Sequence, residues 1–382
     1  MRATLRTRRW AGAAGLLLGA ALAAGCAPEP AVTASPSPTP TVTVAPPTVE
    51  ERAAVIVGGM SVSEQAASIV MGHIASTDPS ALNAYMTQGL GGFLLMGANI
   101  PATDAELPAL TAALAVDPEL PPLIAIDEEG GSVTRLNDDT LPGADVLKSL
   151  PTADTTAAFA ARAELLVRAG VTVNFGTVAD ISADPGSFIH GRALGTEPAG
   201  AAERVAAATE AQEMLVASTL KHFPGHGAAP GDSHRGIPSS ALTLDAWRQA
   251  DAVPFTAGID AGARLLMFGH LAYPAIDPAP ASLSASWHDI ARAELGFDGV
   301  AVTDDLGMLA SSGDSAYADP VANAVAAVAA GNDLVLTVFG STAETAGSLA
   351  AGIAAAVEAG ALPAERLEEA ALRVMTLRLQ LS

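Results

Sequence analysis

The sequence predicts a single (β/α)8 barrel, or TIM barrel, and two observations carry this prediction. Short apolar runs alternate with Ala-rich amphipathic stretches, a pattern typical of βα units and a parallel sheet. Polar residues fall at or near the carboxyl ends of several apolar runs, and in a barrel those ends converge on one rim. The eight candidate strands are residues 68–74, 91–96, 122–127, 171–175, 218–222, 264–270, 299–304 and 332–337.

The first candidate strand has the weakest pattern, because residues 68–74 (SIVMGHI) could equally be helical. The segment that starts at Ser63 reads like the beginning of a capped helix. The final helices are expected near residues 341–359 and 363–380. Neither a second domain nor an internal repeat is visible, so one barrel accounts for the folded part.

A doubly wound open sheet is the rival fold, and the polar residues at the strand ends argue against it. Asp127, Asn174, the pair Lys221–His222, His270 and Asp304 each lie at or near such an end. No Gly-x-Gly-x-x-Gly motif follows the first strand, so the sequence gives no support for a dinucleotide site. We therefore expect no cofactor.

The first 25 residues are predicted to be a signal peptide. Four arginines and no acid precede a short apolar run that ends at Cys26. That run is too short for a transmembrane span, which needs ~20 apolar residues. The small residues before Cys26 resemble a bacterial lipobox, although Ala23 stands where leucine is usual. We expect Cys26 to be lipidated; a plain signal peptide with a chance cysteine is the alternative.

Residues 26–50 are expected to form an extended Pro/Thr/Ser-rich linker, and residues 51–382 the catalytic domain. A lipid on Cys26 followed by such a spacer would hold the domain at the extracellular face of the cell membrane. Removal of the signal peptide leaves 15 basic against 41 acidic residues, a net charge of −26. Such a charge argues against a nucleic-acid partner. The single cysteine excludes a disulfide within the chain, and we expect a monomer.

The most informative stretch of the sequence is KHFPGHG (221–227) with its continuation to His234. It is predicted to be a strand end followed by a long loop that carries two histidines and an aspartate. Asp232 and His234 are two residues apart and face the same side of an extended loop. A carboxylate bonded to one imidazole nitrogen fixes the tautomer of the ring, which can then exchange protons near neutral pH.

These motifs resemble glycoside hydrolase family 3, in particular its β-N-acetylglucosaminidase branch. The resemblance covers about residues 61–340 and rests on five motifs in order. They are IAIDEEGGSVTRL (124–136), VNFGTVADI (173–181), IHGRALG (189–195), KHFPGHG with DSH (221–234) and AELGFDGVAVTDDLGM (293–308).

The resemblance implies the roles of the catalytic residues. Asp304 matches the nucleophile of a retaining mechanism, and Asp305 is the rival, although Asp305 is expected to begin the next helix. Most retaining glycosidases use a second carboxylate as acid/base. The resemblance instead implies His234 as acid/base, with Asp232 orienting it. Because neutral His234 would admit an anionic acceptor, phosphate could replace water.

The resemblance also implies a ring of sugar-binding residues. They are Asp127, Arg135, Arg192, Lys221, His222 and, with weaker support, His270. Asp127 could instead be a salt-bridge partner at the rim, and His270 a structural histidine. Glu128 and Glu129 could suggest a metal site, but no histidine at ligand spacing accompanies them. We therefore expect no metal, and the resemblance makes both glutamates supports of the loop.

Three departures from the family pattern bear on the leaving-group side of the substrate: Ser132, Leu194 and the loop 184–188. The expected activity is release of terminal N-acetylglucosamine from peptidoglycan-derived glycosides or muropeptides. A noncatalytic sugar-binding lipoprotein, a β-glucosidase and a phosphorylase remain the alternatives.

Overall fold

The computed structural model describes residue 25 and residues 46–382. The predicted signal peptide apart from its last residue, Cys26 and most of the predicted linker therefore lie outside the described residues. The folded unit spans Pro47–Ser382. Its first helix, α1, begins at Val49 because Thr48 accepts a hydrogen bond from the Glu51 amide in a capping box. This helix starts two residues before the domain boundary drawn from composition.

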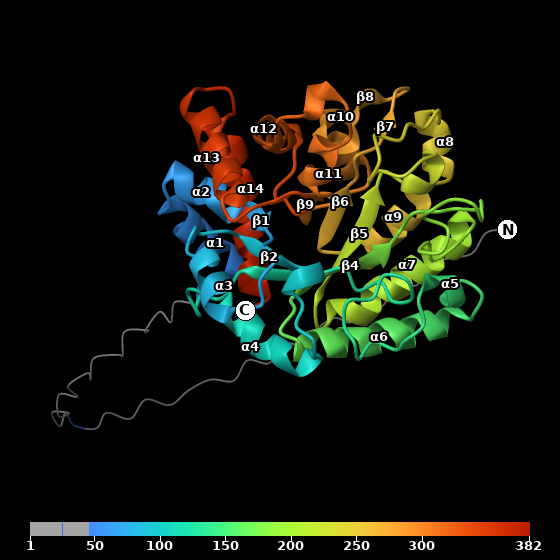
Figure 1. Cartoon of the computed structure of the whole chain (residues 1–382), viewed down its shortest axis with the longest axis horizontal. Helices are drawn as coiled ribbons and strands as arrows, with labels where there is room; N and C mark the ends of the chain where they lie inside the picture. The colour runs from blue at the N-terminus through green and yellow to red at the C-terminus, as the bar shows by residue number, and fades with distance from the viewer. Residues whose placement is uncertain (1–24, 26–45) are drawn as a thin grey trace. The chain divides into compact units, whose positions relative to one another are not determined.

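The eight predicted strands form one parallel sheet that closes into a barrel (Figure 1). The order is β10-β1-β2-β3-β4-β5-β6-β9. A parallel bridge between Val302 and Leu334 joins β9 to the residues that lead into β10 and so closes the seam. The predicted barrel is confirmed, and the open sheet is excluded. The strands are β1 (Val70–Gly72), β2 (Gly92–Leu95), β3 (Leu123–Ile126), β4 (Val173–Val178), β5 (Ala217–Phe223), β6 (Leu265–Phe268), β9 (Val300–Thr303) and β10 (Val335–Leu336).

The helices surround the sheet, as the alternating pattern predicts (Figure 1). The longer ones are α1 (Val49–Gly58), α3 (Pro79–Met86), α6 (Thr152–Arg168), α7 (Pro198–Glu213), α9 (Ala252–Asp260), α12 (Pro320–Ala330), α13 (Thr345–Glu358) and α14 (Ala364–Gln380). The shorter ones are α2 (Val62–Ser68), α4 (Leu107–Ala113), α5 (Ala144–Leu147), α8 (Leu244–Gln249), α10 (Ala285–Asp289) and α11 (Leu306–Ala310), with a π-helical turn at Ile290–Glu294.

Several boundaries follow directly from the sequence. The capped helix expected from Ser63 is α2, whose N-cap is Ser61. The two predicted final helices are α13 and α14. The sequence did not predict the short antiparallel pair of β7 (Ala272–Tyr273) and β8 (Asp277–Pro280). These two strands lie between β6 and α10 in the sequence.

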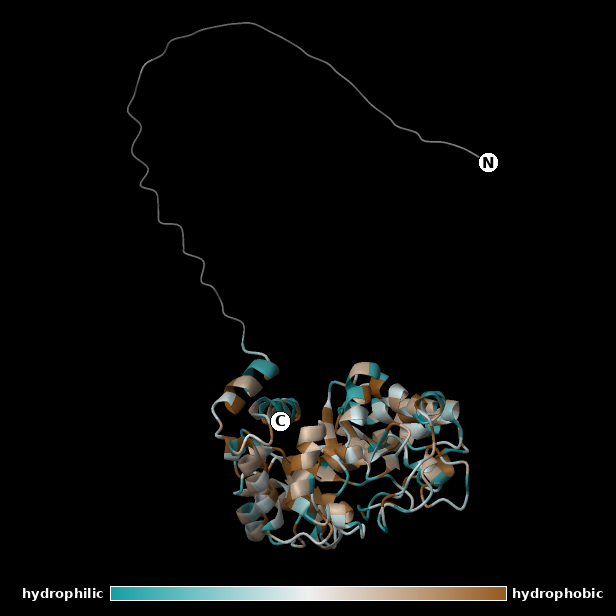
Figure 2. Ribbon diagram, turned by 90° about the horizontal axis from the view of Figure 1, so that it is seen from above, coloured by the Kyte–Doolittle hydropathy of each residue, from teal (hydrophilic) through white to brown (hydrophobic). Residues whose placement is uncertain are grey.

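The strands are buried on both faces, as parallel strands between helices should be. In Figure 2 the hydrophobic colour gathers toward the middle of the folded unit and the hydrophilic colour on outward-facing helices and loops. No helix within the described part of the chain is long and apolar enough to cross a membrane.

One buried carboxylate ties the seam of the barrel to the outer helices. Asp333, just before β10, accepts hydrogen bonds from the Arg292 guanidinium (2.5 Å), the Arg366 guanidinium (2.6 Å) and the Ala301 amide (3.0 Å). Arg373 adds a contact at 3.3 Å. Because Arg366 and Arg373 belong to α14, this carboxylate links β9, β10 and the last helix.

Candidate active site

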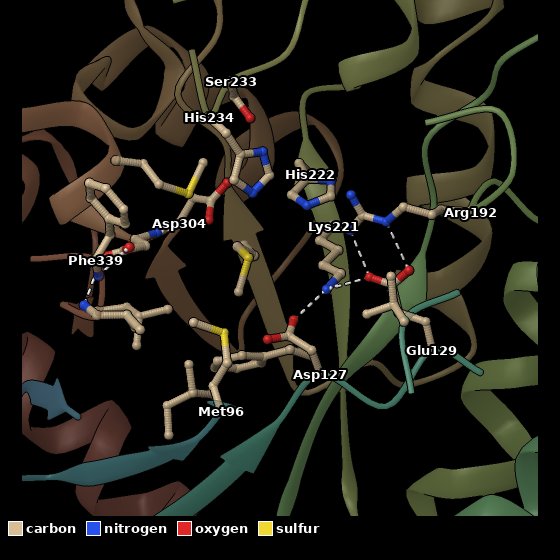
Figure 3. A pocket seen from close by; sticks show the side chains of 18 of the residues that line it. Met96, Asp127, Glu129, Arg192, Lys221, His222, Ser233, His234, Asp304 and Phe339 are labelled. Atoms are coloured by element: carbon tan, nitrogen blue, oxygen red, sulfur yellow. Dashed lines mark hydrogen bonds and ion pairs between the residues drawn. The ribbon is translucent and has the colours of Figure 1, made fainter. Parts of the chain in front are cut away.

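The carboxyl ends of the strands surround a cavity of about 280 Å³. Most of the predicted site residues line it, from β5 and from the loops that follow β3, β4, β5 and β9 (Figure 3). The lining includes Asp127, Glu129, Arg135, Arg192, Lys221, His222, Ser233, His234, Asp304 and Asp305. An apolar wall completes it, formed by Leu94, Met96, Val133, Phe175, Phe188, Met267, Met308, Leu336, Val338 and Phe339. A volume near the small end of the usual range for ligand sites suits one sugar ring.

Four charged side chains form one bonded cluster on one side of this cavity (Figure 3). The Lys221 ammonium lies 2.6 Å from Asp127 and 2.8 Å from Glu129. Arg192 donates to both oxygens of Glu129, at 2.9 and 2.7 Å. Burial by itself raises the pKa of Glu129, but the charges of Lys221 and Arg192 lower it to about 2. Glu129 is therefore ionised near neutral pH, and its charge-assisted bonds hold the Lys221 and Arg192 donors in place.

Asp304 lies directly after β9 and is almost completely buried. Although burial raises the pKa of its carboxyl group, the nearby His222 and His270 rings and the Asp305 amide lower it to about 2. The Asp305 amide donates to Asp304 at 2.8 Å. Asp304 is therefore an ionised carboxylate that faces the cavity, as a nucleophile at an anomeric carbon requires.

Asp305 has a different task, as its position predicts. It is the N-cap of α11 and accepts the Gly307 amide at 2.9 Å. It also accepts the Val338 and Phe339 amides, each at 2.8 Å. With these three donors its carboxylate holds the turn after β9 against the loop after β10. This geometry supports Asp304 over Asp305 as the attacking group.

The Asp180 carboxylate orients the His222 ring. We did not single out Asp180 from the sequence. The His222 ring and Asp180 are 2.7 Å apart, and Asp180 also accepts the backbone amides of His222 and His226. Asp180 is fully buried; burial raises its pKa, but the histidine charges and bonds lower it. The carboxylate thus fixes the Nδ1–H tautomer of His222 and leaves Nε2 for the cavity.

Asp232 and His234 form the predicted pair on the loop of residues 224–238, hereafter the 224–238 loop. The Asp232 carboxylate lies 2.7 Å from His234 Nδ1 and also accepts the His234 amide at 3.0 Å. The slight burial of Asp232 raises its pKa, but these bonds to His234 lower it. His234 lines the cavity together with Asp304. Its Nε2 is the nitrogen left to exchange a proton with a ligand.

Arg135 lines the cavity as predicted, and its backbone amide donates to Glu128 at 2.9 Å. Its Nε is buried without a hydrogen-bond partner in the described chain. His270 has a different role from the predicted sugar contact. Its Nδ1 bonds Ser282 Oγ at 2.7 Å and its Nε2 bonds the Asp305 carbonyl at 2.8 Å. Both nitrogens are thus occupied, and His270 supports the turn that carries Asp304 rather than the substrate.

The two adjacent glutamates after β3 also separate in role. Glu128 is fully buried, and one of its oxygens accepts the Arg135 and Leu136 amides, so it supports the loop as expected. Glu129 was expected to do the same, but it faces the cavity and pairs with Lys221 and Arg192. Adjacent residues in an extended segment point in opposite directions. The spacing of two between Asp127 and Glu129 was the signal that could have identified Glu129.

The family departures fall in different places. Leu194 is buried in the core and Ser132 is exposed, so neither lines the cavity. Phe188, in the altered loop, does line it. No group of three or more potential metal ligands occurs among residues 46–382.

Comparison with known families matches residues 64–377 to the glycosyl hydrolase family 3 N-terminal domain. This chain belongs to glycosyl hydrolase family 3. The chain is 36% identical over 255 residues to a β-hexosaminidase of Pseudomonas aeruginosa, and this match covers 65% of the chain and 74% of the relative. It is 38% identical over 233 residues to a β-hexosaminidase of Stenotrophomonas maltophilia, covering 58% and 69%.

Solved structures agree with this family assignment. A family 3 β-N-acetylglucosaminidase from Paenibacillus sp. FPU-7 superposes with a TM-score of 0.77 at 30% identity, covering 85% of the chain. The chain spans 63% of that protein. A β-N-acetylhexosaminidase from Beutenbergia cavernae has a TM-score of 0.73 at 29% identity, covering 84% of the chain and 98% of that protein. The resemblance stated from the motifs is confirmed, and the chain is a glycoside hydrolase.

Proposed function

We propose that this glycoside hydrolase is a retaining β-N-acetylhexosaminidase that releases terminal N-acetylglucosamine from peptidoglycan-derived glycosides. One observation carries the proposal: His234, whose ring is bonded to Asp232, lines the same cavity as the ionised Asp304. A proton donor and a nucleophile are the two groups that the retaining reaction requires. The names of the similar enzymes support an N-acetylglucosaminide as substrate.

The charged cluster binds the sugar ring at its hydroxyl groups. Asp127 accepts hydrogen bonds, and Arg135, Lys221 and Arg192 donate them. Glu129 keeps Lys221 and Arg192 apart and charged, because both cations bond to its carboxylate. The sugar therefore meets donors and acceptors that need little rearrangement, which reduces the cost of binding.

In the first step, a carboxylate oxygen of Asp304 attacks the anomeric carbon and forms a glycosyl ester. The bond to the leaving oxygen breaks, and that oxygen takes the proton from Nε2 of His234. Asp232 stabilises the proton-bearing ring through Nδ1 and holds it in the required orientation. The step leaves a covalent intermediate on Asp304, a neutral His234 and a free alcohol.

In the second step, neutral His234 accepts a proton from water while the water oxygen attacks the anomeric carbon. The ester bond to Asp304 breaks, and the carboxylate is released. Two inversions at the same carbon give net retention. Because the base is neutral, phosphate can take the place of water and give the sugar 1-phosphate; this is the alternative outcome within the same mechanism.

We further propose that the enzyme works at the extracellular face of the cell membrane, as a monomer anchored by a lipid on Cys26. The arginine-rich start, the apolar run and the small residues before Cys26 support this location. The Pro/Thr/Ser-rich residues 27–46 would then act as the spacer between lipid and barrel. Mass spectrometry of the mature protein, with Cys26→Ala as control, tests the lipid directly.

The decisive test of function compares two glycosides, with and without phosphate, using one enzyme preparation. We expect the β-N-acetylglucosaminide of p-nitrophenol to be hydrolysed far faster than the β-glucoside, with the β-anomer as first product by NMR. A faster glucoside would make the enzyme a β-glucosidase. Sugar 1-phosphate formed in phosphate buffer would make it a phosphorylase. Tight binding of N-acetylglucosamine without turnover of any glycoside would leave a sugar-binding protein.

A further inference from the structure

We propose that Phe188 is a positioning residue that holds the His234 imidazole over the cavity. The inference rests on the proposed function, because it assigns Phe188 to the acid/base step. Phe188 belongs to the loop after β4, in the segment that departs from the family pattern. It lies on a different element from His234, so its contact ties the 224–238 loop to the barrel.

Phe188 makes edge-to-face contacts with two histidine rings. The Phe188 and His234 ring centroids are 6.5 Å apart, with an angle of 85° between the ring planes. The Phe188 and His226 ring centroids are 4.6 Å apart, with an angle of 74° between the planes. Both arrangements fall in the range that aromatic pairs prefer. Phe188 therefore contacts both an exposed imidazole, that of His234 with 59% of its side chain exposed, and the buried imidazole of His226.

The buried partner is suited to be an anchor. His226 is 1% exposed, and neither of its ring nitrogens has a hydrogen-bond partner in the described chain. Its backbone amide is fixed by Asp180. The next residue, Gly227, approaches the Ile181 carbonyl so closely that an added Cβ would lie 1.6 Å from that oxygen. This part of the 224–238 loop is therefore packed firmly against the end of β4.

The catalytic part of the same loop is held much more loosely. Within the described chain, every hydrogen bond of residues 231–235 stays inside that segment. A second cavity, of about 350 Å³, borders the segment, since Pro230, Gly231 and Asp232 are among the residues that line it. Phe188 lines this cavity as well as the sugar cavity. It is thus the partition that keeps the His234 ring on the side of Asp304.

The Phe188 loop is rigid enough for this task. Lys148, the residue after α5, donates to the His190 carbonyl, so this loop, unlike residues 231–235, is bonded to another part of the barrel. Within the loop, the Gly186 amide donates to Asp184 at 2.8 Å, and His190 Nδ1 bonds the Ser182 carbonyl at 2.9 Å. Ile189, next to Phe188, is fully buried. Without the phenyl ring, His234 could turn into the second cavity and lose its alignment with the leaving oxygen. A misplacement of about 1 Å at a catalytic group can cost about 10²-fold in rate.

The test uses leaving groups that differ in their need for a proton. The phenolate released from phenyl β-N-acetylglucosaminide is basic, so its departure needs a proton from the acid. The 2,4-dinitrophenolate released from the corresponding glycoside is much less basic and can depart without a proton. For Phe188→Ala we expect kcat/KM to fall about 10- to 100-fold on the phenyl glycoside. On the dinitrophenyl glycoside we expect a fall of less than about threefold. Phe188→Tyr, which keeps the ring edge, should recover most of the phenyl glycoside activity.

Two further variants make the result decisive. Phe339→Ala removes another aromatic ring of the same cavity, from the loop after β10, and is expected to affect both substrates alike. Phe188→Leu keeps apolar volume without an aromatic edge and should behave like Phe188→Ala. Equal losses of Phe188→Ala on both substrates, or no loss, would overturn the proposal. Failure of the wild type on every N-acetylglucosaminide, or of His234→Ala to show the leaving-group pattern, would instead overturn the proposed function.

Discussion

The two halves of the active site are built in opposite ways. Asp304 and the cluster around Lys221 lie at strand ends, are buried, and bond to residues from several elements. Asp232 and His234 lie on the 224–238 loop, are partly exposed, and bond mainly to each other. The first half depends on the barrel for its geometry, while the second carries its geometry within a segment of three residues.

This difference suits the two tasks. A nucleophile and a sugar-binding cluster must keep one arrangement, and a barrel rim provides it. A proton shuttle must serve two steps in which different molecules occupy the leaving side, and a loop can adjust to both. Substitutions in the barrel half should therefore change stability and activity, and those in the loop half activity alone.

The largest effect is expected for Asp304→Ala, which removes the carboxylate that we propose as the nucleophile. We expect kcat to fall by at least about 10³-fold, because no covalent intermediate can form. Turnover of the p-nitrophenyl β-N-acetylglucosaminide measures the loss, and mass spectrometry of the wild type with a slow fluorinated substrate should locate the adduct on Asp304. Asp305→Asn is the matched control and should form the adduct; an adduct on Asp305 would reverse the assignment.

Lys221→Met should cost stability as well as activity. It leaves the Asp127 and Glu129 carboxylates in the rim without their shared cation. Breaking a buried ion pair in this way costs about 3–5 kcal/mol. Chemical denaturation measures the free energy of unfolding, with Arg248→Met, which breaks a half-exposed surface pair, as the control. Unchanged stability of Lys221→Met would remove the distinction between the two halves.

Asp232→Asn should cost about 10²-fold in kcat, since the amide no longer fixes the tautomer of His234 or stabilises the protonated ring. The free energy of unfolding should stay within ~0.5 kcal/mol of the wild type, because the pair makes no bond to another element of the described chain. The pH profile of kcat/KM should change in shape. A large loss of stability here would show that the loop depends on the barrel after all.

The last effect concerns the pH dependence of stability rather than turnover. Burial raises the pKa of Glu128 from 4.5 to about 8, so the folded state holds its proton more tightly than the unfolded chain. The stability from this proton is complete below about pH 4.5 and is lost as the pH rises through 8. Glu128→Gln should therefore flatten the decline in unfolding free energy between pH 5 and pH 8. Urea titrations of both proteins at the two pH values would detect it; parallel declines would contradict it.

Much of the fold could be predicted because parallel strands in a barrel are uninterrupted apolar runs with polar ends. All eight strands were found in this way, although β1 kept only three residues of its predicted seven. The β7–β8 pair was missed, because a two-residue strand and the sequence Asp277–Pro280 carry no strand pattern.

The site was predictable as far as motifs and strand ends reach. Position at the rim identified Asp127, Lys221 and Asp304. It could not show whether a given side chain faces the cavity or bonds within the protein. His270 was therefore assigned to the substrate, although both of its nitrogens bond within the protein. Phe188 and Phe339 lie in loops without periodicity, so only the coordinates bring them to the cavity.

The carboxylate of Asp333 bonds the last helix, α14, to the barrel. Two of its four donors come from α14, and the others come from residues at the barrel's closing seam. A nascent chain that has not yet delivered its last twenty residues would carry a buried anion with half of its partners missing. We therefore expect chains that end before α14 to lack two donors to Asp333 and to be degraded by proteases faster than the full chain.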